Sequence, residues 1–198
     1  MKKLLCVALL FCVAGFAAEK GFKPLFNGKN LDGWDGDPKL WSVRDGMIVG
    51  STEGVKLKSN SFLITKQPYK NFILRAEVKL RNHNSGIQFR SEALPDWVVR
   101  GYQADMAENN YWGSIYDERG RGMLAEGWKG KAETVVKAKD WNEYEILCDG
   151  DHIQLKLNGL VTADIHDSAK LEGIIALQIH AGPPMEAYFR NVRIKILK

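Results

Sequence analysis

The stretch NSGIQFR (84–90) has two properties around which the rest of the chain can be arranged. Successive side chains of a β-strand point to opposite faces, so Ile87 and Phe89 share one face, while Gln88 and Arg90 share the other beside a glycine. Large apolar side chains place the first face against a core. The second face carries an amide, a guanidinium and bare backbone, and it therefore predicts a platform for a polar ligand.

Two further segments repeat this pattern of an apolar face opposite an amide and an ionisable group. Gln103 and Asp105 alternate with apolar residues, and Gln178 and His180 do the same near the C-terminus. Solvent-facing strands are more often rich in lysine, glutamate and threonine. Repeated glutamine beside Arg, Asp and His therefore favours a shared binding face over an ordinary wet surface.

Short alternating segments separated by glycine-containing turns run along the whole chain after residue 40. Asp45-Gly46 and Asn158-Gly159 are typical two-residue hairpin turns. No long segment has a helical period, so any helix should be short. The sequence predicts an all-β sandwich or jelly roll of antiparallel sheets, with a long loop region at about 107–131. Strands are expected at 41–44, 47–50, 62–65, 72–80, 84–91, 102–106, 141–148, 152–157, 161–165, 173–180 and 188–197.

The first residues have the order of a secretory signal peptide. A basic start with Lys2 and Lys3 precedes an apolar run at 4–13 and a stretch of small residues. The apolar run is short for a membrane anchor, and Phe11 is large for the position before a lipidated Cys12. We expect a signal peptide at 1–17, one domain at 18–198 without a membrane span, and a secreted or periplasmic location.

Composition excludes several classes of protein and site. The formal charge of +4 includes two leader lysines, and the remaining charges are interspersed, so no basic stripe for nucleic acid exists. Of the three cysteines, Cys6 and Cys12 lie in the leader, while Cys148 sits in an alternating strand and is expected to be a buried apolar group. No cofactor is expected to be required. The acidic loops lack an ordered calcium-ligand pattern, which leaves calcium possible but unsupported.

The segment 97–128 adds aromatic and acidic side chains to the predicted face. Aromatic rings stack on the apolar faces of sugars, and carboxylates and amides bind hydroxyl groups, so this mixture favours a carbohydrate ligand. Some of these aromatics could equally anchor the loop on the sandwich. The candidate contacts from this segment are Glu108, Trp112 and Tyr116.

Taken in order, these motifs make the chain similar to the 3-keto-disaccharide hydrolase domain family, formerly a domain of unknown function. The resemblance rests on PLFNGKNLDGW (24–34), NSGIQFR (84–90), GYQADM (101–106), NEYEILCDGDHIQLKLNG (142–159) and ALQIHAG (176–182). It covers 21–197 and implies a concanavalin A-like lectin/glucanase jelly roll. The family commonly reads G-Y-E-x-Q at 101–105, so the acid and the amide are exchanged in this chain.

The resemblance implies cleavage of 3-keto-glycosides. Oxidation at C3 acidifies the hydrogen on C2, so a base can remove it and expel the group at C1, and water addition completes a net hydrolysis. We hypothesise that Asp105 or His180 is the base and that Arg90 stabilises the enolate. Gln88, Gln103 and Gln178 would orient hydroxyl groups, and Glu108 or Tyr116 would assist the leaving group. A separate sugar 3-oxidoreductase acting upstream is the implied partner.

Other functions remain open at this point. Ordinary glycosidases need two facing carboxylates, and the recurring strands offer no clear second acid. A non-catalytic, lectin-like carbohydrate-binding module is the main alternative, because sandwich folds host both lectins and enzymes. A structural or interaction domain is a third possibility.

Overall fold

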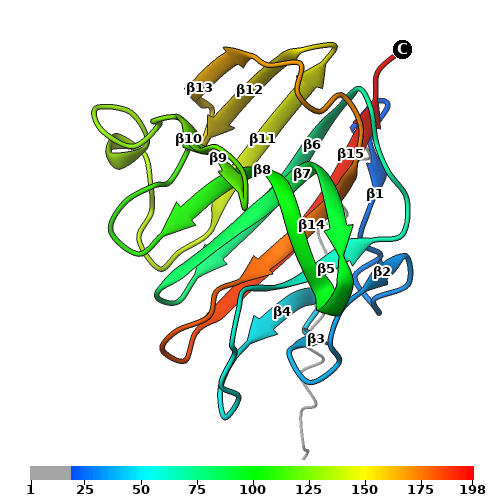
Figure 1. Cartoon of the computed structure of the whole chain (residues 1–198), viewed down its shortest axis with the longest axis vertical. Coiled ribbons are helices and arrows are strands. Elements are labelled where there is room, and N and C mark those ends of the chain that lie inside the picture. Colours follow the sequence, from blue (N-terminus) through cyan, green and yellow to red (C-terminus); the bar gives the residue numbers. More distant parts are fainter. Residues whose placement is uncertain (1–18) are drawn as a thin grey trace, which may run out of the picture.

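Two antiparallel β-sheets packed face to face form the protein, whose computed structural model describes residues 19–198 (Figure 1). The predicted leader at 1–17, with Cys6 and Cys12, lies outside the described residues. No helix within 19–198 is long and apolar enough to cross a membrane. Two short 3-10 helices, Pro95–Trp97 and Ala132–Thr134, agree with the expectation that helices are short.

The first sheet has eight strands, and it combines hairpins of consecutive strands with pairs that are far apart in sequence. Strand β1 (Lys23–Pro24) pairs with the last strand of the chain. The other strands lie in the order β13 (Leu160–His166), β12 (His152–Leu157), β11 (Asn142–Asp149), β6 (Phe72–Leu80), β15 (Glu186–Ile196), β4 (Met47–Ser51) and β3 (Trp41–Arg44).

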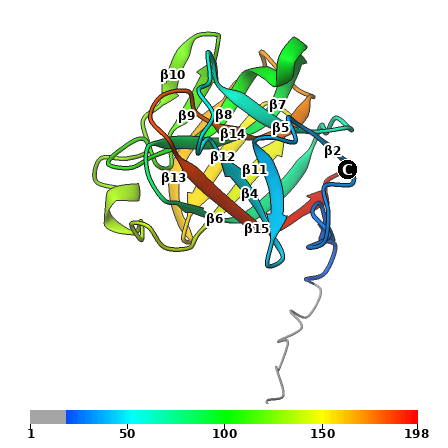
Figure 2. The same ribbon diagram turned by 90° about the horizontal axis from the view of Figure 1, so that it is seen from below.

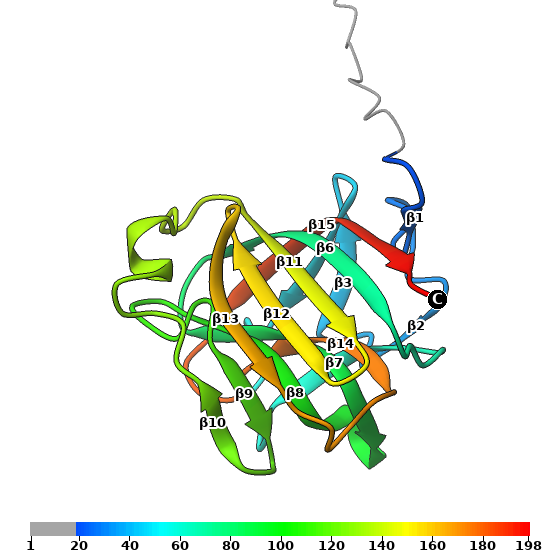
Figure 3. The ribbon, with the colours of Figure 1, turned by 90° about the horizontal axis from the view of Figure 1, so that it is seen from above.

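The second sheet has seven strands, and it carries all three segments of the predicted face. Their order is β10 (Gly122–Ala125), β9 (Ile115–Glu118), β8 (Val98–Ala107), β7 (Asn84–Leu94), β14 (Ile174–Ile179), β5 (Ser61–Thr65) and β2 (Trp34–Asp35). Figures 2 and 3, seen from below and above, show the two sheets as stacked layers. The jelly-roll sandwich expected from the sequence is confirmed.

Strict alternation of side chains explains how the core forms between the layers. Every second residue of β6, from Phe72 to Leu80, is buried against the opposite sheet. Phe89 of β7 stacks on Tyr102 of β8, with ring centroids 5.6 Å apart. Tight turns join the strands, and both residues of Asp45-Gly46 and of Asn158-Gly159 have the positive φ that type I′ turns require.

The region 107–131 departs in part from its expected form. It is loop over most of its length, but β9 and β10 lie inside it and extend the second sheet beyond β8. Their short length and their aromatic, acidic and glycine content hid the alternation. This hairpin matters for function because it widens the face that carries Gln103 and Asp105.

Candidate functional site

A hairpin arm divides the outer face of the seven-stranded sheet into a covered half and an open half. The regular pairing of β7 with β8 is interrupted between Phe89 and Glu92, where Arg90 adopts a φ of 46°. Beyond this bulge the arm (residues 91–101) folds back over the sheet. Its Trp97 and Val99 join a small apolar cluster on the outer face, with Phe62, Ile64, Ala176 and Ile174.

The bulge also corrects one prediction from the sequence. Arg90 was expected on the same face as Gln88, but a bulge breaks the two-residue period and turns its side chain away. The buried guanidinium donates to the carbonyl oxygens of Lys70 and Gly150, at 2.8 and 2.6 Å, and to Oδ1 of Asn71 at 3.1 Å. Arg90 therefore ties the two sheets together and lies outside the binding face.

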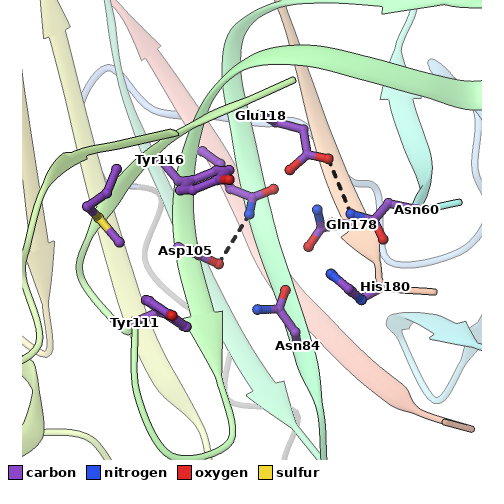
Figure 4. Close-up of a pocket in the computed structure, with 10 residues that line it drawn as sticks. Asn60, Asn84, Asp105, Tyr111, Tyr116, Glu118, Gln178 and His180 are labelled. Carbon is purple, nitrogen blue, oxygen red and sulfur yellow. Dashed lines mark hydrogen bonds between the residues drawn. The ribbon is translucent and has the colours of Figure 1, made fainter. Parts of the chain in front are cut away.

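The open half of the face holds a polar pocket of about 420 Å³ (Figure 4). Five predicted residues from three segments meet there: Gln103, Asp105, Tyr116, Gln178 and His180. Five residues that the prediction had not selected complete the lining: Asn60, Asn84, Tyr111, Glu118 and Met123.

Two of these additions had a signal in the sequence. Asn84 has the same two-residue period as Gln88, and Glu118 lies two residues after Tyr116. Asn60 and Met123 come from segments whose position over the face depends on the tertiary fold. Period-two reasoning therefore could have extended the site along each strand, but not across the loops.

A chain of hydrogen-bonded side chains leads from beneath the hairpin arm to Asp105. Ser91 Oγ donates to Oε1 of Gln88 at 2.8 Å, and Gln88 Nε2 donates to Oε1 of Gln103 at 2.8 Å. Gln103 Nε2 then lies 3.2 Å from Oδ1 of Asp105. Gln88 is fully buried and supports the pocket from beneath without lining it.

Gly86 makes this arrangement possible. The side chain of Gln103 lies over its backbone, and a methyl group on Gly86 would come within 2.4 Å of Cδ of Gln103. Gly86 also faces Asp105 on the neighbouring strand. The glycine noted in the sequence is thus the floor on which the Gln103 amide rests.

Asp105 is a buried carboxyl with a strongly altered acidity. Burial raises its pKa to about 7, because the charged form loses hydration, and the negative charge of Glu118 adds to the effect. Hydrogen bonds from the Met106 amide, at 2.9 Å, and from Gln103 oppose the shift. Both reach Oδ1, and a hydrogen bond from the Asn84 side chain opposes the shift as well.

His180 has one ring nitrogen committed to the backbone. Its Nδ1 lies 2.6 Å from the carbonyl oxygen of Ala181, which can only accept, so Nδ1 carries the proton of the neutral ring. Nε2 is then an acceptor. Asn60 holds this corner by accepting from the Ala181 amide at 3.0 Å and donating to Glu118 at 3.2 Å.

Two other predicted contacts lie elsewhere. Trp112 is buried and stacks on Tyr144 at 6.1 Å, so it anchors the loop, as one reading of the sequence allowed. Glu108 accepts from the His83 amide at 3.4 Å and lies with Trp112 in a separate cavity of about 370 Å³. The expectation that Glu108 and Trp112 join the other site residues does not match this geometry.

Metal ligands do not gather in the described residues. Within 19–198, no group of three or more His, Cys, Asp or Glu side chains is placed to hold a metal ion. The polar groups that line the pocket are amides, carboxyls, phenols and an imidazole.

Comparison with known proteins identifies a family and agrees with the fold. The model of the 3-keto-alpha-glucoside-1,2-lyase-like domain matches residues 21–195. A presumed glycosyl hydrolase from Parabacteroides distasonis is 26% identical with a TM-score of 0.69, and the match covers 89% of this chain and 99% of that one. No curated protein matches the chain.

More distant structures share the fold alone. A second presumed glycosyl hydrolase of P. distasonis is 22% identical over 90% of this chain and 95% of that one, with a TM-score of 0.68. The carbohydrate-binding module CBM66 of Bacillus subtilis is 18% identical over 82% and 95%, with a TM-score of 0.64. The family match and the likeness to a glycosyl hydrolase structure support a carbohydrate-related role.

Proposed function

Since the chain belongs to the 3-keto-alpha-glucoside-1,2-lyase-like domain family, we propose that it cleaves glycosides whose sugar carries a ketone at C3. The proposal rests on one observation. A carboxyl group with a pKa of about 7 and an imidazole with a free acceptor nitrogen line the same sugar-sized pocket. The carboxyl can donate a proton to the leaving oxygen, and the imidazole can accept the proton from C2 in the same elimination.

The reaction separates into elimination and hydration. A base takes the proton from C2, the C2–H electrons form the C1=C2 double bond by way of the enolate, and the C1–O bond breaks. The leaving oxygen receives a proton and departs as an alcohol. Water then adds its hydroxyl to C1 and a proton to C2, which gives a free 3-keto sugar and a net hydrolysis.

The geometry favours one of the two assignments that the sequence left open. We assign His180 Nε2 as the base, because the Ala181 carbonyl holds the ring proton on Nδ1. Asp105 is then the acid, because burial keeps a proton on its carboxyl near neutral pH. Arg90 has no part in this scheme, and the enolate oxygen must take its hydrogen bonds from pocket amides.

The substrate and its origin follow from the same chemistry. An ordinary sugar has a hydroxyl at C3, so a separate sugar 3-oxidoreductase is required upstream. If the leader at 1–17 is removed during export, the enzyme would cleave its glycoside substrate outside the cytoplasm. Both statements extend the proposal and can be tested apart from the chemistry.

The proposal is tested with a p-nitrophenyl 3-keto-glucoside beside its unoxidised parent. We expect nitrophenol release from the keto compound alone, and deuterium at C2 of the product above an enzyme-free control when the reaction is run in D2O. Asp105→Asn and His180→Gln should each lower kcat by about 10²–10⁴. His152→Gln, on the opposite sheet, is the matched control.

The pH profile separates the two assignments of acid and base. With Asp105 as the acid, kcat falls as the pH rises through about 7 and the carboxyl loses its proton. With Asp105 as the base, kcat rises through the same range.

Equal release from the unoxidised glycoside would instead indicate an ordinary hydrolase using Asp105 and Glu118. Binding of unmodified glycans without any turnover would show that the protein is a lectin-like binding module and not an enzyme.

A further inference from the structure

Gln178 is a buried amide whose polar atoms have no partner in the protein. The side chain is fully buried at the floor of the pocket, and within residues 19–198 neither Nε2 nor Oε1 has a hydrogen-bond partner. Oδ1 of Asn84, which lines the same pocket, is also buried and unpaired. Such groups are costly in a folded protein, and their presence together in one pocket points to a ligand that pairs with them.

Their position is set by three neighbouring strands. Gln178 lies on β14, Asn84 on β7 and Asp105 on β8, and Gly86 lies between Gln178 and Asp105 without a side chain. Adjacent strands are about 4.8 Å apart, so Gln178 and Asp105 stand on strands roughly 10 Å apart, with Gly86 and the Gln103 amide that rests on it between them. In Figure 4 the Gln178 amide lies among Asp105, Asn60 and His180, and the Asn84 amide lies below it in the view.

The unpaired atoms define the groups that a ligand has to offer. Gln178 supplies a donor and an acceptor side by side in either orientation of its amide, and Asn84 supplies a further acceptor. A 3-keto sugar carries an acceptor-only oxygen at C3 between hydroxyl donors at C2 and C4. An amide can bridge a ketone and one adjacent hydroxyl, and a second hydroxyl of the same ring can donate to Asn84.

We propose that Gln178 is the residue that recognises the ketone, donating from Nε2 to the C3 oxygen and accepting from a neighbouring hydroxyl, with Asn84 Oδ1 accepting from another. This assignment rests on the proposed function and gives the enolate oxygen a donor in place of Arg90. The Nε2 hydrogen bond strengthens as negative charge develops on that oxygen, so Gln178 affects kcat as well as binding.

Binding is tested by calorimetry with 3-keto-1,5-anhydroglucitol, which has no exocyclic leaving group, and with unoxidised 1,5-anhydroglucitol. Gln178→Met removes both polar atoms in a side chain of similar shape, and Gln178→Glu keeps acceptors only when binding is measured at a pH at which the new carboxyl is ionised. We expect each to weaken binding of the keto ligand at least tenfold. Gln178→Glu should retain binding of the alcohol, which can donate to it, so the preference for the ketone is lost.

If Gln178 only stabilised the fold, Gln178→Met would lower Tm, and the proposal predicts the opposite. Removal of an unpaired buried amide relieves a cost of folding, so Gln178→Met should raise Tm while weakening binding. Gln154→Met on β12 is the matched control, because its amide lies on the other sheet and is expected to leave binding of the ligand unchanged. Asn84 is tested with keto ligands that lack the hydroxyl at C2 or the hydroxyl at C4. Loss of the hydroxyl that donates to Asn84 should weaken binding to the wild type, and it should weaken binding to Asn84→Ala only slightly.

The two hypotheses fail independently. If the enzyme cleaves a 3-keto-glycoside while Gln178→Met binds the keto ligand as tightly as the wild type, the assignment of Gln178 is wrong and the function stands. If no cleavage occurs but keto binding depends on Gln178, the assignment stands and the catalytic function is wrong. Tight binding of the alcohol and the ketone alike by the wild type would also overturn the recognition of the ketone.

Discussion

Asp105 owes its chemistry to a position that little water reaches. Only 5% of the residue is exposed, and the polar side chains around it provide neutral amides and a like charge, without a cation. The neutral form is therefore favoured far above the pH at which a free carboxyl ionises. The same burial that suits an acid near pH 7 also lowers the stability of the folded protein at high pH.

Asp105→Asn should therefore stabilise the protein in a pH-dependent way. Below pH 3.8 the group is protonated in both states, whereas between 3.8 and about 7 only the unfolded chain releases its proton, so wild-type stability falls as the pH rises. The amide cannot titrate. Denaturant unfolding should show little gain at pH 4 and a gain of about 2–4 kcal/mol at pH 8. A gain independent of pH would show that ionisation is not its cause.

Gly86→Ala tests whether the floor of the pocket needs bare backbone. The new methyl group would overlap Gln103, so the Gln103 amide must move and its hydrogen bonds to Gln88 and Asp105 are lost. We expect at least a tenfold loss of affinity for the keto ligand with a folded protein. In the double variant with Gln103→Ala the clash is absent, so adding Gly86→Ala to Gln103→Ala should have little effect. Equal losses in both backgrounds would contradict the steric explanation.

At the scale of elements, the hairpin arm shows how far alternation alone can be followed. From Asn84 to Phe89 every side chain points as the period of two predicts, because regular pairing with β8 keeps the strand flat. At Arg90 the pairing slips, and the slip depends on contacts with the loop at Lys70 and the turn at Gly150. Those contacts are far away in sequence, so no local pattern could have revealed them.

Arg90→Met should destabilise the protein strongly without altering the pocket directly. The change leaves two carbonyl oxygens without their charged donor, and we expect a loss of about 3–5 kcal/mol in the free energy of unfolding. Arg100→Met, on the exposed side of the arm, should leave the unfolding midpoint unchanged. At temperatures where Arg90→Met remains folded, its KM should match the wild type. A raised KM in the folded variant would show that Arg90 contributes to the site after all.

For the whole molecule, the fold could be predicted from sequence far better than the site. Turn residues and alternation mark most strands one at a time, and a sandwich is the common solution for many short strands. The pocket instead depends on which strands become neighbours. Gln103 and Gln178, which repeat one pattern, line the same pocket, whereas Asn60 was missed because its place there depends on bonds to Ala181 and Glu118, both distant in sequence.

Cys148 offers a measurement of the stability of the whole sandwich. It is fully buried on the core face of β11, and burial raises the pKa of its thiol to about 12. In protein without residues 1–17, thiol labelling at pH 8 should therefore proceed only at the rate of global unfolding. The labelling rate should rise in Arg90→Met and not in Arg100→Met. Rapid labelling of the native wild type would show that the sheets separate locally near β11.

The side chain of Arg90 also bears on the order in which the molecule is assembled. It joins β7 to two neighbouring segments of the other sheet, near Lys70 and Gly150, so its hydrogen bonds form only when both sheets are in place. Contacts of this kind are expected to be absent from the folding transition state, so their loss should accelerate unfolding and leave the folding rate nearly constant. Arg90 would then determine how long the native protein lasts, and not how quickly it forms.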